Sequence, residues 1–188
     1  MKRILLVSAL FGRLLHASAI YQIVADTSSL SGTSANLDFQ FNPGGSDADP
    51  ATASVASLLP GADFTLTNAL PLNEQTEAVV LGNTLSFTLT LSGIAIDSPT
   101  PLVTAGTTFG FSIFDETFTH PLLTSDPNGF LFTLDIFPHN VRTVTTFGAV
   151  NVSEVTVATP EPSAAALLGI GLLLMSLSLR HTKRDKAR

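Results

Sequence analysis

The chain has 188 residues, of which 45% are hydrophobic and 13% are charged, and it contains neither cysteine nor tryptophan. Without cysteine it has no disulfides, no thiol nucleophile and no thiolate metal site. The formal net charge is −6, but most basic residues lie near the two ends, so charge is best considered segment by segment.

The N-terminal segment, residues 1–19, has the pattern of a secretory signal peptide. A basic start over 1–3 precedes a mostly apolar run over 4–15, and Ala17 and Ala19 supply the small residues of a cleavage site. We predict that signal peptidase cleaves after Ala19. An uncleaved membrane helix is the alternative.

The central segment, residues 20–157, has the alternation typical of β-strands. It is clearest over 85–92, where leucine and phenylalanine alternate with serine and threonine. A period of two places alternate side chains on opposite faces, which is the pattern of a half-buried antiparallel strand. We expect strands at 21–26, 37–41, 53–58, 64–67, 85–92, 109–113, 130–136, 142–147 and 150–157.

Short strands separated by turn signals predict one all-β domain, an antiparallel sandwich or jelly-roll. The polar stretch 73–77, with 79–81 after it, could form one short helical turn. Most of the phenylalanines lie on strand faces and are expected in the core. The predicted core includes Leu37, Phe39, Leu85, Phe87, Leu89, Phe109, Phe111, Phe132 and Leu134.

The central segment is strongly acidic. Residues 20–162 contain fourteen acidic residues and one basic residue, Arg142, which gives a formal charge of −13. Such a surface repels nucleic acid and anionic lipid and attracts divalent cations and cationic polymers. Solubility alone would also explain this charge. We therefore expect no nucleic-acid partner.

A turn after the second expected strand offers oxygen ligands for calcium. Asn42 provides an amide oxygen, and Asp47 and Asp49 provide carboxylates two residues apart. Hard oxygen ligands of this kind suit Ca²⁺, although the stretch matches neither an EF-hand loop nor a nonapeptide repeat. A solvated acidic loop is the alternative, and no other cofactor is predicted.

The central segment shows no arrangement typical of an active site. His120 and His139 lie beside prolines in turn-like stretches and are expected in exposed loops. Asp115 and Glu116 are adjacent, so on a strand they would point to opposite faces. We expect no enzyme activity. Carbohydrate binding usually uses exposed Trp or Tyr, and the chain has only Tyr21, so binding in a polar groove is the form left open.

The C-terminal segment, residues 158–188, combines three elements in a fixed order. Pro160, Glu161 and Pro162 form an extended spacer, because neither proline can continue a helix. Residues 163–179 carry no charge and, as a helix, would extend about 26 Å, slightly short of a bilayer core of about 30 Å. A cytoplasmic basic cluster then ends the chain: Arg180, Lys183, Arg184, Lys186 and Arg188.

This order of features resembles the PEP-CTERM sorting signal of Gram-negative bacteria. The resemblance implies recognition of the tripeptide by exosortase, a membrane protease-transpeptidase that removes the helix and releases the protein outwards. An ordinary C-terminal anchor is the alternative. Parts of 21–44, 108–115 and 122–129 are similar to one group of PEP-CTERM cargo proteins. That group has no established activity, so the resemblance implies no functional residues.

Together these patterns predict an exported protein. We expect an inner-membrane intermediate held by the C-terminal helix, followed by release to the cell surface or extracellular matrix. The expected role is that of a structural matrix component associated with exopolysaccharide. A polysaccharide-binding module is the alternative, and a secreted hydrolase is a third.

Overall fold

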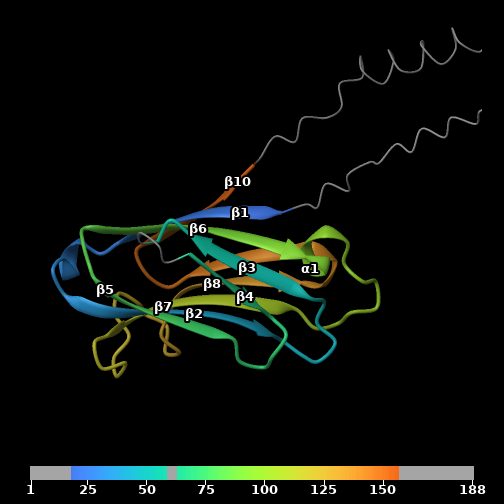
Figure 1. Cartoon of the computed structure of the whole chain (residues 1–188), viewed down its shortest axis with the longest axis horizontal. Coiled ribbons are helices and arrows are strands. Elements are labelled where there is room, and N and C mark those ends of the chain that lie inside the picture. The colour runs from blue at the N-terminus through green and yellow to red at the C-terminus, as the bar shows by residue number, and fades with distance from the viewer. Residues whose placement is uncertain (1–17, 59–62, 157–188) are drawn as a thin grey trace, which may run out of the picture. The chain divides into compact units, whose positions relative to one another are not determined.

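A computed structural model describes residues 18–58 and 63–156. Within these ranges the chain forms two five-stranded antiparallel sheets that pack face to face (Figure 1). The expected all-β antiparallel architecture is therefore confirmed. Residues 1–17 of the predicted signal peptide lie outside the described residues, as do the predicted sorting tripeptide, apolar helix and basic cluster.

The first sheet has the strand order β10-β1-β6-β3-β4. Its long central strand β6 contains the cleanest alternation in the sequence, and its apolar side faces the second sheet. The bounds are β1 Ala19–Asp26, β3 Ala51–Ala56, β4 Phe64–Thr67, β6 Thr84–Gly93 and β10 Val150–Val155.

The second sheet has the strand order β5-β2-β7-β8-β9. Strands β2 and β7 are its centre, and a register shift between Phe111 and Ser112 interrupts the pairing of β7 with β8. The bounds are β2 Ser34–Pro43, β5 Glu74–Val80, β7 Thr107–Asp115, β8 Phe130–Phe137 and β9 Val141–Thr146. The short helices are η1 Ser28–Leu30, α1 Ile94–Asp97 and η2 Pro138–Asn140.

The prediction of a helical turn in this part of the chain is wrong, because residues 74–80 form strand β5. β5 is an edge strand, and it places Gln75 and Glu77 on the same side as the apolar residues of β2. At an edge, solvent reaches both faces, so polar side chains can point inward. The inward polar residues removed the apolar alternation that marks the other strands.

The core between the sheets is built on phenylalanine. Phe39 contacts Phe87 and Phe64 edge-to-face, with ring centroids 5.4 and 5.0 Å apart, and Phe87 meets Phe111 at 5.1 Å. Edge-to-face packing of this kind adds stabilisation beyond the burial of area. All nine residues predicted for the core are buried.

Candidate functional site

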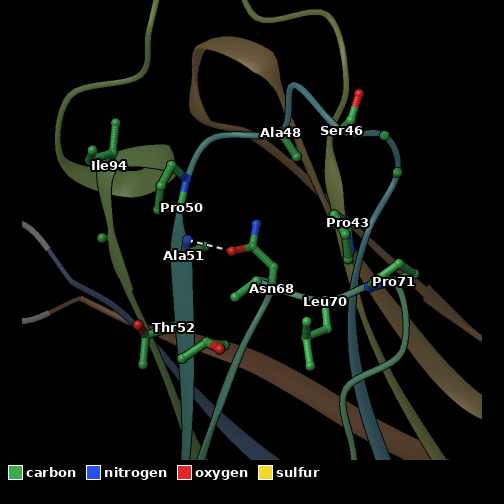
Figure 2. Close-up of a pocket in the computed structure, with 15 residues that line it drawn as sticks. Pro43, Ser46, Ala48, Pro50, Ala51, Thr52, Asn68, Leu70, Pro71 and Ile94 are labelled. Atoms are coloured by element: carbon green, nitrogen blue, oxygen red, sulfur yellow. Dashed lines mark hydrogen bonds between the residues drawn. The ribbon is translucent and has the colours of Figure 1, made fainter.

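A pocket lies at one end of the sandwich. It has a volume of about 840 Å³ and lies between the β2–β3 loop, the β4–β5 loop and the start of α1. In Figure 2, Leu70 and Pro71 stand on one side and Pro50 and Ile94 on the other, with Asn68 between them. Leu70 is 61% exposed and Ile94 is 44% exposed. No charged side chain is among the described residues that line it.

Asn68 holds the floor of this pocket together. Its side-chain oxygen accepts a hydrogen bond from the Ala51 amide, and its Nδ2 donates to the Asp49 carbonyl and to Oγ1 of Thr107, at 2.7 to 2.8 Å. Asn68 is buried, and a buried amide with these bonds is fully used as a donor. We assign Asn68 a structural role that fixes three chain segments around the pocket.

The three predicted calcium ligands bond to different partners. Both carboxylate oxygens of Asp49 accept bonds from Thr100, from its amide at 2.7 Å and its hydroxyl at 2.6 Å. Oδ2 of Asp47 accepts the corresponding pair from Thr104 at 3.0 and 2.9 Å, and these bonds lower the pKa of Asp47. The amide oxygen of Asn42 accepts the Asn73 amide proton. Asp47 and Asp49 thus clamp the loop that follows α1, and calcium at this turn stays a prediction.

A second polar feature runs along the solvent side of the second sheet. The outward residues of β2 are linked along the strand: Nδ2 of Asn42 donates to Gln40, and Nε2 of Gln40 donates to Oδ2 of Asp38 at 2.8 Å. Asp38 is only 3% exposed. Burial, together with the neighbouring carboxyl group of Glu74, raises the pKa of Asp38 to about 6. This is the most perturbed buried acid among the described residues.

Sequence reasoning missed Asp38 because its position is that of an outward residue. Alternation places it opposite Leu37 and Phe39 and so predicts exposure. β2 is flanked by β5 and β7, and Asp38 pairs with Thr76 on one side and Ser112 on the other. The carboxylate lies in a row of outward polar residues on β2, so the sequence carried no signal of its burial, which depends on the two neighbouring strands.

The two histidines are exposed, as the turn-like stretches predicted. Nδ1 of His120 lies 2.9 Å from Oδ2 of Asp115. The hydrogen bond from His120, with further bonds from Thr119 and Thr117, holds the pKa of the Asp115 carboxyl well below its usual range. Asp115 therefore organises the loop after β7. Among the described residues, Glu116 takes part in hydrogen bonding only through its backbone carbonyl, which accepts a bond from Nδ2 of Asn36.

Tyr21 is buried and 3% exposed, so its ring does not offer a surface for stacking a sugar. Tyr21 lies opposite Glu154 in the ladder, and Arg142 forms an ion pair with Glu154 at 2.9 Å. Burial raises the pKa of the Tyr21 phenol, an effect that Arg142 opposes. The only basic residue of the acidic domain is thus already paired.

Comparisons with protein-family models, curated proteins and solved structures found no match for this chain. Among residues 18–58 and 63–156, no helix is both long enough and apolar enough to cross a membrane. In the same ranges, no three histidine, cysteine or acidic side chains gather as a metal-binding group.

Proposed function

We propose that this protein is an exported, non-catalytic β-sandwich that becomes part of the cell surface or extracellular matrix. During export, signal peptidase removes the N-terminal segment, and exosortase then cleaves at the PEP-CTERM signal. In this proposal the acidic domain associates with exopolysaccharide, and the membrane helix serves only the intermediate stage.

The observation that supports the proposal is where the described strands begin and end. The first strand starts at Ala19, at the predicted signal-peptide cleavage site, and the last strand ends at Val155, shortly before the Pro160-Glu161-Pro162 tripeptide. Cleavage at both sites would leave the two sheets whole, apart from the pairing of Ala19 with Leu91 at the end of β1. Release by two cleavages requires that the strands of the exported domain lie between the two cleavage sites.

Mass spectrometry of the exported form, in a host that carries an exosortase, tests this route. We expect a C-terminus within 159–162 and the loss of 163–188. Replacing Pro160, Glu161 and Pro162 by alanine should trap the full-length chain in the membrane. A control with alanine at Thr156, Val157 and Thr159 should still be released. An exported wild-type protein that retains Arg188 would contradict the proposal.

A polysaccharide-binding module is the second candidate, and the pocket favours it. Its lining is uncharged and combines apolar side chains with hydroxyl and amide groups, which is the usual composition of a small-molecule site. Because the domain around it is acidic, a neutral sugar chain would enter it with less repulsion than an anionic one.

Affinity electrophoresis of the full chain in mild detergent, through gels containing a neutral glucan or a polyuronate, tests this second function. We expect retardation by the glucan that is lost in Leu70→Asp. Leu102→Asp is the matched control, since Leu102 is 89% exposed and does not line the pocket. Equal mobility of wild type and Leu70→Asp in every gel would remove this candidate.

A further inference from the structure

Two carboxyl groups meet on the solvent side of the second sheet. Asp38 on β2 and Glu74 on the edge strand β5 lie on the outward face of adjacent strands, and the carboxyl group of Glu74 contributes to the raised pKa of Asp38. In the β2–β5 ladder, Glu74 lies opposite Gln40, and Asp38 lies opposite Thr76. Glu74 and Asp38 are therefore diagonal neighbours on the same face of the sheet. Glu74 is exposed and can move, whereas Asp38 is 3% exposed and fixed in a central strand.

One oxygen of this pair has no partner among the described residues. Oδ2 of Asp38 accepts a hydrogen bond from Gln40, but Oδ1 is buried and receives none. Leaving a buried carboxylate oxygen without a hydrogen-bond donor is unfavourable for the folded state. Both ionised groups of the pair are acceptors only. They can lie side by side only if a proton or a cation lies between them.

No basic side chain of the domain can supply that positive charge. Arg142 is the single lysine or arginine in residues 20–162, and it is paired with Glu154 on β10, in the other sheet. His120 contacts Asp115, and His139 lies in η2. The groups opposite Asp38 in the ladder are Thr76 on β5 and Ser112 on β7, which carry no charge. Compensation at neutral pH must therefore come from solution.

We propose that Asp38 and Glu74 hold a divalent cation of the calcium class on the solvent side of the second sheet. Oδ1 of Asp38 and the carboxylate of Glu74 are the charged ligands. Water fills the remaining positions, because the amide of Gln40 turns its Nε2 toward Asp38 and its Oε1 toward Asn42. Calcium accepts irregular sets of carboxylate, amide and water oxygens, whereas magnesium requires a near-ideal octahedron. The inference does not depend on the route of export.

Calcium titration of the full chain in mild detergent tests the site, with isothermal calorimetry and circular-dichroism melts at pH 7.5. Calcium chloride should give saturable binding and a melting temperature that rises with concentration, as mass action requires. Sodium chloride at matched ionic strength should not reproduce the rise. Glu74→Gln and Asp38→Asn should each weaken binding about tenfold or more, the effect of about 1.4 kcal/mol.

Three controls make the outcome specific. Glu77→Gln changes an acid on the same strand β5 but the other face and should bind calcium as wild type does. Asp47→Asn changes the loop predicted from the sequence and should leave the Glu74-dependent binding unchanged. Wild-type affinity should be about tenfold weaker at pH 5 than at pH 7.5, since protons compete for a carboxyl group of pKa about 6.

The proposal would be overturned by any of three results. These are an unchanged calcium affinity in Glu74→Gln, an equal stabilisation by sodium, or a loss of binding in Asp47→Asn alone. The last result would place the ion in the β2–β3 loop instead. Absence of calcium binding by the folded wild-type chain would show that a shared proton balances the pair.

Discussion

Nη1 of Arg142 lies 2.9 Å from Oε1 of Glu154, and this ion pair joins β9 of one sheet to β10 of the other. Both residues are on the inward side of edge strands, opposite Ile136 and Tyr21 in their ladders. Both charged groups also influence the pKa of the Tyr21 phenol on β1. The only tyrosine and the only basic residue of the domain therefore lie at the same edge of the sandwich, beside β9 and β10.

We expect this ion pair to contribute modestly to stability. The two side chains are 24% and 44% exposed, so solvent screens them, and a double-mutant cycle of Arg142→Met and Glu154→Gln should give a coupling of about 0.5–1 kcal/mol. Urea denaturation measures it, and 1 M salt should reduce it. Glu116→Gln is the control and should lie within about 0.5 kcal/mol of wild type. Purely additive effects of the two changes would show that the contact contributes nothing.

Phe87 should be essential to the core. It is 1% exposed, and Phe87→Ala removes edge-to-face contacts to Phe39 and Phe111, so we expect a loss of about 3–5 kcal/mol. Phe137 is 48% exposed, and Phe137→Ala serves as the matched control with a small effect. The free energy of unfolding from urea titration distinguishes them. Similar losses in the two variants would contradict the assigned packing.

Gly110 should not tolerate a side chain while Phe130 covers it. A Cβ on Gly110 would overlap Cε1 of the Phe130 ring and lie 2.8 Å from its Cδ1. We expect Gly110→Ala to cost about 1–3 kcal/mol, the usual cost of overpacking. Adding Phe130→Ala should relieve the overlap, so the double variant should be more stable than the two single effects predict. Additive losses would mean that the ring moves aside freely.

Asp38 should make stability fall as pH rises. Its folded-state pKa of about 6 lies above the ordinary value of 3.8, so the folded state binds the proton more tightly. The resulting stabilisation is full below pH 3.8 and is lost as pH rises through 6. In EDTA, the free energy of unfolding should decrease by about 1 kcal/mol between pH 5 and 7.5 relative to Asp38→Asn. Parallel pH profiles of the two proteins would contradict this assignment.

The sequence by itself determined the class of fold and most of its strands. Alternation from Leu85 to Ser92 predicted β6, and the same pattern placed Phe39, Phe87 and Phe111 in the core. These predictions succeed because the two-residue period of a strand is local and records which face is buried. The exposure of His120 and His139 was predicted from a different local signal, the prolines beside them, which are typical of turns.

Only the tertiary structure decided which residues meet. β5 escaped detection because its inward Gln75 and Glu77 are acceptable only at a sheet edge. The proximity of Asp38 to Glu74 depends on the pairing of β2 with β5, and the ion pair of Arg142 with Glu154 depends on how the two sheets pack. The local pattern fixes the direction in which a side chain points, but its neighbours are set by long-range pairing between strands. A candidate site built from such neighbours therefore could not be predicted from the sequence.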